Sequence, residues 1–208
     1  AIQVVSVLIS DAYNSNMHAY GYSSGNPTGG QAFSMSLNDS GNRFTGRHWD
    51  GRTRFEGASY TTGKGYVLSH AMNAGATYLD TQIVQNGLTG NIDTNLPNNG
   101  LMFDAETPKF AVGSSPNNSL RGDVALGEIL VFKEVLSDQN RILLEGYLAH
   151  KWGIAGELVI GHEYRNTDGN STGNTAWAGT SNAKYGNAVY FDGTDDGLSF
   201  EDLDELDA

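Results

Sequence analysis

Short runs of alternating apolar and polar residues constrain the fold of this chain most. In the run AFSMSL at 32–37, Phe33, Met35 and Leu37 recur every second residue, which is the period of a strand with one buried face. The run VVSVLI at 4–9 has the composition of a buried strand. Further strands are expected at 43–55, 65–71, 77–85, 109–112 and 127–132, each bounded by Gly, Asn, Asp or Pro. This spacing predicts an all-β fold, an antiparallel β-sandwich of the jelly-roll type.

One segment has helical rather than strand periodicity. Its apolar residues recur at helical spacing, at Ile142, Leu143, Leu144, Tyr147, Leu148 and Trp152. Ser137 precedes the segment as a good N-cap, Asp138 lies in its first turn, and Gly153 follows it as a C′ residue. The sequence therefore predicts one short helix near 138–152.

Composition excludes several classes of protein. The 208 residues are enough for one domain covering 1–208. With 12 Lys and Arg against 24 Asp and Glu, the net charge of −12 argues against binding to nucleic acid or to an anionic membrane. No apolar stretch approaches the roughly 20 residues of a spanning helix, so membrane insertion is not expected. The absence of cysteine excludes disulfides and thiolate metal sites.

Several segments of the second half resemble a known family. The letters LRGDVALGEILVF at 120–132, LSD at 136–138 and EGYLAHKWG at 145–153 resemble the C-terminal signature of laminin G-like, concanavalin A-like sandwich domains. The letters NAVYFDGTDD at 187–196 resemble the early strand and turn of the same domains. The resemblance implies a sandwich capped by the short helix, within a large calcium-rich repeat adhesin of the RTX type. An extracellular location at a bacterial cell surface is expected, which suits the acidic, cysteine-free composition.

The order of these segments departs from the family. Its domains place the FDGTDD strand before the other strands, whereas here the strand follows the helix. Reading residues 200–208 directly into 1–9 restores the usual succession. We therefore expect one circularly permuted domain, in which a C-terminal hairpin at 187–200 completes the sheet begun by the N-terminal strand. The alternative is a fragment cut across a tandem repeat.

Acidic loops predict bound Ca²⁺, because calcium prefers six to eight hard oxygen ligands. The best candidates are Asp192, Asp195 and Asp196, which surround a glycine turn. The alternative is an Asx-turn, in which the Asp side chains accept hydrogen bonds from local amides. The family resemblance favours calcium.

Weaker calcium candidates lie in other loops. Asp168 and Asn170 imitate the start of an EF-hand loop, but the twelfth position is Gly179 rather than a bidentate Glu. Asp104 and Asp123 are isolated acids that could join a site built from several loops. Each alone is more often solvated.

A cluster of basic residues stands out in this acidic chain. Arg43, Arg47, Arg52 and Arg54 flank a turn expected at Asp50-Gly51, together with Trp49. A guanidinium group binds a carboxylate through two hydrogen bonds, so the cluster could hold an acidic sugar or the free C-terminus of a peptide. The alternative is that these arginines pair with neighbouring acids on a sheet face.

Tyr60 could extend this cluster as an aromatic platform, together with Trp49, Tyr20 and Tyr22. The alternative is that these aromatic residues fill the core or its edge.

These features predict a non-catalytic, calcium-dependent adhesion module. Gly21–Gly25 has the letters of a G-x-S-x-G motif but is followed by NPTGG rather than a helix, so an enzyme is not expected. Similar adhesin domains bind glycans or peptide C-termini on a host or neighbouring cell, and the arginine cluster favours a peptide or protein terminus. The alternatives are a lectin-like carbohydrate-binding module and a structural spacer. In each case we expect a monomeric module within a larger chain.

Overall fold

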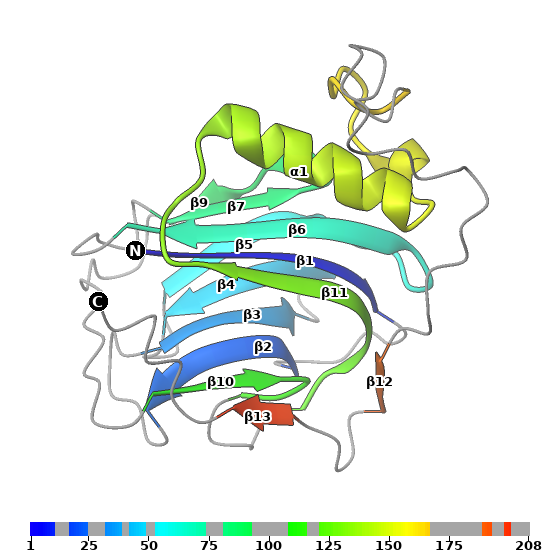
Figure 1. The fold of residues 1–208 in the computed structure, drawn as a ribbon. Helices are drawn as coiled ribbons and strands as arrows, with labels where there is room; N and C mark the ends of the chain where they lie inside the picture. Colours follow the sequence, from blue (N-terminus) through cyan, green and yellow to red (C-terminus); the bar gives the residue numbers. More distant parts are fainter. Residues whose placement is uncertain are drawn as a thin grey trace.

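The described residues of the chain form two antiparallel sheets and one α-helix (Figure 1). The computed structural model describes residues 1–10, 17–24, 32–38, 42–48, 53–73, 81–92, 108–115, 121–166, 189–192 and 198–200. This architecture confirms the predicted all-β sandwich with a single short helix. Among the described residues, no helix is long and apolar enough to cross a membrane.

Sheet A has six strands, and α1 (Asp138–Lys151) packs against it. Its order is β12 (Val189–Asp192), β11 (Asp123–Phe132), β1 (Ile2–Ser10), β6 (Gly65–Met72), β7 (Gln82–Gln85) and β8 (Leu88–Thr89). Sheet B has seven strands, in the order β13 (Leu198–Phe200), β10 (Pro108–Val112), β2 (Met17–Ser24), β3 (Ala32–Asn38), β4 (Arg43–His48), β5 (Thr53–Ser59) and β9 (Asn91–Ile92). The strand expected at 43–55 is thus two strands, and β2 was not predicted.

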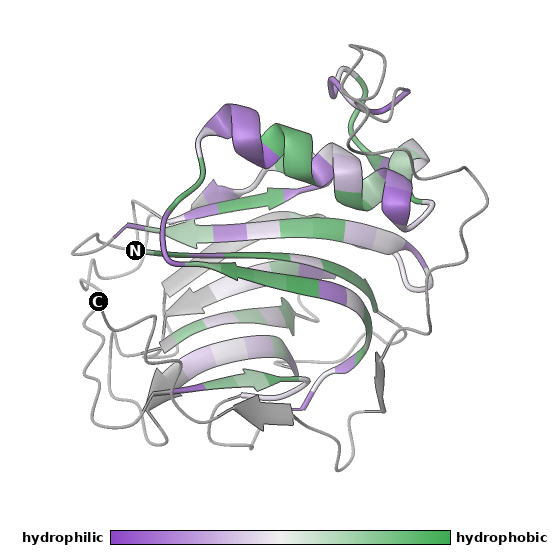
Figure 2. Cartoon of the chain, in the orientation of Figure 1, coloured by the Kyte–Doolittle hydropathy of each residue, from purple (hydrophilic) through white to green (hydrophobic). Residues whose placement is uncertain are grey.

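The core between the sheets follows the alternation in the sequence. Phe33, Met35 and Leu37 of β3 are at most 1% exposed and lie in the core cluster, as predicted. Apolar residues of β1 and β6 join them from sheet A, including Leu8 and Leu68. Figure 2 shows the apolar character of β1 and β11, which lie beside each other in sheet A.

Helix α1 covers the face of sheet A that is turned away from this core (Figure 1). Val5, Val7 and Val67 of the sheet pack against Leu148 and Ala149 of the helix. The predicted caps are confirmed. The side chain of Ser137 accepts a hydrogen bond from the amide of Asn140 at 3.3 Å, and Gly153 has the positive φ of 70° that a C′ residue needs.

The end of the EGYLAHKWG segment fastens the helix to β11. Glu128 Oε2 accepts a hydrogen bond from Trp152 Nε1 at 3.0 Å and lies 2.7 Å from Lys151 Nζ. The indole ring lies directly over Gly127, where a Cβ atom would be 3.0 Å from three ring atoms. The hydrogen bond to Glu128 is the main cause that raises the pKa of Lys151. This part of the signature therefore has a structural role in positioning α1.

The C-terminal strands differ from the expected hairpin. β12 pairs with β11 at the edge of sheet A, whereas β13 pairs with β10 at the edge of sheet B. β1 lies inside sheet A between β11 and β6, so it has no free edge for a C-terminal strand. The segment 187–200 thus contributes one strand to each sheet of the same sandwich, and the predicted hairpin is wrong.

Candidate functional site

The face of sheet B that is turned away from the core carries polar residues at many of its register positions. In β3 and β4 the core residues alternate with Ser34, Ser36 and Thr45, which therefore lie on the opposite face. One row of consecutive Cα partners crosses five strands through this face and consists of His18, Ser36, Thr45, Glu56 and Asn91. Because α1 packs on sheet A, no helix among the described residues occupies this face.

A second row of Cα partners lies beside the first. It consists of Ala111, Gly21, Ser34, Arg47 and Arg54. A third row, at the end of the sheet, joins Asn38, Arg43 and Ser59. The three rows hold no apolar residue larger than alanine. By sequence, the residues at these register positions carry hydroxyl, amide, carboxylate, imidazole and guanidinium groups, which together can donate and accept hydrogen bonds.

The middle of this polar face is buried and its ends are accessible. Ser36 and Thr45 are 0% exposed, whereas Ser59 and Asn91 are exposed and Arg43 is half-buried. The side chain of Ser36 donates a hydrogen bond to the carbonyl oxygen of Thr45 at 3.2 Å. Thr45 Oγ1 itself has no hydrogen-bond partner among the described residues. A buried hydroxyl without a partner costs free energy.

The structure brings two of the predicted arginines onto one strand. Arg43 and Arg47 both lie in β4, and the Cα atom of Arg47 is opposite that of Arg54 in β5. Trp49 and Arg52, also predicted to bind ligand, lie outside the described residues. Sequence analysis did not single out His18, Ser36 or Thr45, although the alternation within β3 and β4 was the signal that could have found the last two.

The predicted aromatic platform is corrected at Tyr60. Its side chain is 2% exposed and packs in the core, with its ring centroid 4.7 Å from that of Phe44. Tyr20 and Tyr22 lie in the same core cluster. Their aromatic rings supply apolar area between the sheets, so the alternative of a core role holds for these three tyrosines.

Two of the predicted calcium ligands meet at the edge of sheet A. The Cα atoms of Asp123 and Asp192 are partners in the β11–β12 pair, although 69 positions separate them in the sequence. Asp195 and Asp196 follow closely after β12 but lie outside the described residues, as do Asp104, Asp168 and Asn170. Among the described residues, no three Asp, Glu or His side chains gather as a metal site.

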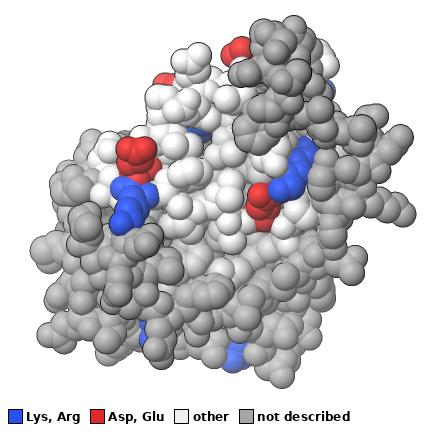
Figure 3. All heavy atoms as spheres, in the orientation of Figure 1, with Lys and Arg blue, Asp and Glu red and all other residues white. Residues whose placement is uncertain are grey.

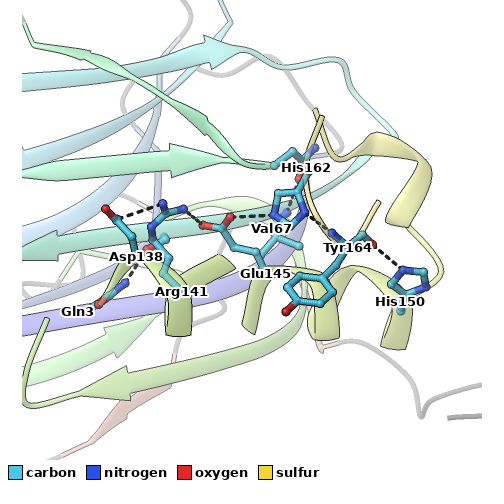
Figure 4. A network of polar contacts seen from close by, with 10 residues as sticks. Gln3, Val67, Asp138, Arg141, Glu145, His150, His162 and Tyr164 are labelled. Atoms are coloured by element: carbon cyan, nitrogen blue, oxygen red, sulfur yellow. Dashed lines mark hydrogen bonds and ion pairs between the residues drawn. The ribbon is translucent and has the colours of Figure 1, made fainter. Parts of the chain in front are cut away.

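A buried ionic network lies away from both of these regions, between α1 and the segment after it (Figure 4). Arg141 Nη1 is 2.7 Å from Glu145 Oε1, and His162 Nε2 is 3.3 Å from Glu145 Oε2. The Glu145 side chain is 1% exposed. Burial alone would lower the pKa of Arg141, but the charges of Glu145 and Asp138 outweigh it and raise that pKa.

The same network holds residues 158–165 against the helix. His150 Nε2 lies 2.7 Å from the carbonyl oxygen of Tyr164, and the amide of Tyr164 donates to His162 Nδ1 at 3.2 Å. A Cβ atom on Gly146 would be 2.3 Å from Cβ of Tyr164, so the glycine permits this close approach. Glu145, Gly146 and His150 of the EGYLAHKWG segment therefore position the chain beyond the helix.

The surface over α1 offers no patch of one charge sign. In Figure 3 the described part of this face is mostly uncharged, and in two places acidic and basic side chains lie next to each other. The polar rows of sheet B are therefore the better candidate for ligand binding.

Comparisons with known proteins concern the fold. The sequence matches no protein-family model and no curated protein sequence. The structure is similar to Trypanosoma rangeli sialidase in complex with the inhibitor DANA, with a TM-score of 0.49 and 13% identity over 66% of this chain and 21% of the sialidase. It is also similar to domain 4 of AbnA, a GH43 extracellular arabinanase from Geobacillus stearothermophilus in complex with arabinotriose, with a TM-score of 0.40 and 17% identity over 65% of this chain and 62% of that domain. The chain spans about a fifth of the sialidase.

These comparisons correct the expected ligand. The similar structures are a sialidase and an arabinanase domain that holds arabinotriose, rather than a peptide-binding adhesin. The prediction of a module for peptide termini is therefore contradicted.

Proposed function

We propose that the chain is a non-catalytic, carbohydrate-binding β-sandwich module of the laminin G-like kind, carried by an extracellular bacterial surface protein. The observation that carries this proposal is the outer face of sheet B, where rows of hydrogen-bonding residues lie and no helix of the described part of the chain packs. A saccharide presents many hydroxyl groups, and each of them both donates and accepts hydrogen bonds. Hydroxyl, amide and charged side chains at neighbouring register positions suit such a ligand.

The arginines of this face favour an acidic saccharide. Arg47 and Arg54 are direct partners across β4 and β5, and like charges directly opposite each other destabilise a strand pair. A carboxylate on the ligand would relieve this repulsion and bind the planar guanidinium groups through paired hydrogen bonds. The expected ligand is therefore a saccharide bearing a carboxylate, such as a uronate or a sialic acid.

We expect a glycan array to show binding to carboxylate-bearing saccharides in preference to neutral ones. Replacing Arg47 or Arg54 with Gln should weaken binding about tenfold, or about 1.4 kcal/mol, because a charge-assisted hydrogen bond is lost. Titration calorimetry of each folded variant measures the change. Lys64→Gln is the matched control, because Lys64 pairs with Glu157 on the exposed surface and lies outside the three rows.

Two outcomes would count against this proposal. Binding of neutral saccharides that the arginine variants leave unchanged would contradict the acidic ligand. A folded protein that binds no saccharide at all would favour the structural spacer.

Calcium is the cofactor we propose for the edge of sheet A. The register of β11 and β12 places the Cα atoms of Asp123 and Asp192 opposite each other, and a divalent cation would offset the repulsion between two such carboxylates. Both aspartates can supply the hard oxygens that calcium prefers, and Asp195 and Asp196 are close enough in sequence to contribute more.

Thermal unfolding in millimolar calcium and in excess chelator tests the cofactor. An ion that binds only the folded state stabilises it by about 2.7 kcal/mol at a concentration one hundred times its Kd. We expect calcium to raise the Tm of the natural sequence by several degrees, on the order of 2–4 °C per kcal/mol. The double variant Asp123→Asn, Asp192→Asn should lose this rise. Equal Tm values with calcium and with chelator would remove the ion from the proposal.

A further inference from the structure

The two C-terminal strands occupy the outer edges of both sheets. β12 hydrogen-bonds to β11 in a register that runs from Asp123↔Asp192 to Leu126↔Val189. β13 hydrogen-bonds to β10 in a register that runs from Phe110↔Phe200 to Val112↔Leu198. Each is the outermost strand of its sheet, so each has a single partner strand. The strands are also short, with four and three residues.

The chain between these strands and the rest of the sandwich is long. Residues 167–188 separate the segment packed on α1 from β12. An extended chain covers about 3.3–3.6 Å per residue, so a connection of this length can reach about 70 Å. Two packed sheets lie only about 10 Å apart. The length of the connection therefore does not require β12 to pair with β11 of its own chain.

Removal of β12 and β13 would leave β11 and β10 as unpaired edges. The backbone N–H and C=O groups of an unpaired edge are a template for another strand. These groups are the same in every copy of the chain, so β12 and β13 of a second copy fit the same registers. Exchange of identical elements between copies needs no new contact beyond those already made within one chain.

We infer that β12 and β13 of one copy complete the two sheets of a second copy, so that the protein assembles by strand exchange. The occupant of each edge is the corresponding strand of another molecule of this chain. This inference rests on the pairing of β11 with β12 and of β10 with β13, and not on the ligand of sheet B, although Ala111 of β10 belongs to the second row.

Engineered disulfides distinguish pairing between chains from pairing within one chain. The natural sequence has no cysteine, so introduced thiols have no competitors. Ala125 and Tyr190 are Cα partners in the β11–β12 pair, and Ala111 and Ser199 are Cα partners in the β10–β13 pair. Opposed residues of antiparallel strands have the Cα separation of about 4.5–5.5 Å that a disulfide needs.

The decisive experiment mixes two single variants of the full chain under mild oxidation. Ala125→Cys chains mixed with Tyr190→Cys chains should form a covalent heterodimer, because only strand exchange brings these thiols together. Ala111→Cys mixed with Ser199→Cys should do the same. The crossed mixture of Ala125→Cys with Ser199→Cys is the control, because these positions belong to different sheets. We expect about tenfold less heterodimer from the crossed mixture. Ala125 and Ser199 are not partners in either strand pair, so their thiols do not reach the separation that a disulfide needs.

Concentration provides the second readout. The double variant Ala125→Cys, Tyr190→Cys should close within one chain when dilute. It should form dimers and longer ladders as its concentration approaches about 1 mM, the order of effective concentration for two sites joined by a short linker. The inference is overturned if the double variant closes only within its own chain at every concentration and the single-variant mixtures give no more heterodimer than the control. Failure of every pair to cross-link would also overturn it, because the strands would then not lie at these edges.

Discussion

Replacement of Glu145 with Ala is expected to destabilise the protein strongly. The Glu145 carboxylate is 1% exposed and contacts Arg141 and His162 at once. Without it, a guanidinium group that is itself only 9% exposed loses its buried partner and keeps only the exposed carboxylate of Asp138, 3.2 Å away. Breaking a buried ion pair from one side costs about 3–5 kcal/mol, because an uncompensated charge stays in the interior. For a chain of this size the loss corresponds to a fall in Tm of roughly 6–20 °C.

The matched control for this prediction is an exposed ion pair. Lys64 and Glu157 lie 3.1 Å apart, with side chains that are 50% and 38% exposed. Glu157→Ala should change the free energy of unfolding by less than about 1 kcal/mol, because solvent screens such a pair. Chemical denaturation of both variants measures the difference. Similar losses for Glu145→Ala and Glu157→Ala would show that the buried network has no special weight.

The sequence predicts α1 and its immediate surroundings well, because these depend on neighbouring residues. The spacing of the apolar positions gives the helix, and Ser137 and Gly153 give its ends. The pair of Arg141 and Glu145 also follows from helical i,i+4 spacing. The contact with His162 does not follow, because the segment that carries it has no periodicity and returns to the helix through tertiary packing.

The EGYLAHKWG segment shows how a recognisable motif acquires a physical meaning only in the structure. From sequence it indicates a family. In the fold, Glu145 and His150 hold the chain that follows the helix, whereas Trp152 and Lys151 hold Glu128 of sheet A. Its residues are structural, so they gave no direct information about a ligand.

The candidate site was predicted only in part, because it depends on strand register. Arg43 and Arg47 were found as a local cluster, but the rows that join them to β3 and β5 exist only after the strands pair. Asp123 and Asp192 were each named as acids, and their meeting depends on a chain that returns to the sandwich after α1. The predicted hairpin failed for the same reason, because alternation within a strand does not specify its partner.

Gly46→Ala is expected to destabilise the core between the two sheets. Gly46 lies in β4 of sheet B, directly beneath His70 from β6 of sheet A. A Cβ atom at this position would be 2.7 Å from His70 Nε2 and 3.1 Å from two ring carbons. The ring has little room to move, because His70 is 0% exposed and stacks on Phe33 with centroids 3.8 Å apart.

The expected loss for Gly46→Ala is about 1–3 kcal/mol or more, because overpacking forces the core out of its preferred rotamers and shifts the backbone. Chemical denaturation measures this loss. Gly156→Ala is the matched control, because a Cβ atom on Gly156 has no other atom within 4 Å among the described residues. It should change stability by about 0.5 kcal/mol or less.

A double-mutant cycle with His70 tests the physical cause. His70→Ala alone removes the ring that packs on Phe33 and should cost stability. In the double variant Gly46→Ala, His70→Ala, the new methyl group no longer meets the ring, so the combined loss should be smaller than the sum of the two single losses by about 0.5–3 kcal/mol. Additive losses would show that the two positions do not contact each other. Subadditive losses would establish that the absence of a side chain at position 46 is what allows the imidazole of sheet A to reach the aromatic residues of sheet B.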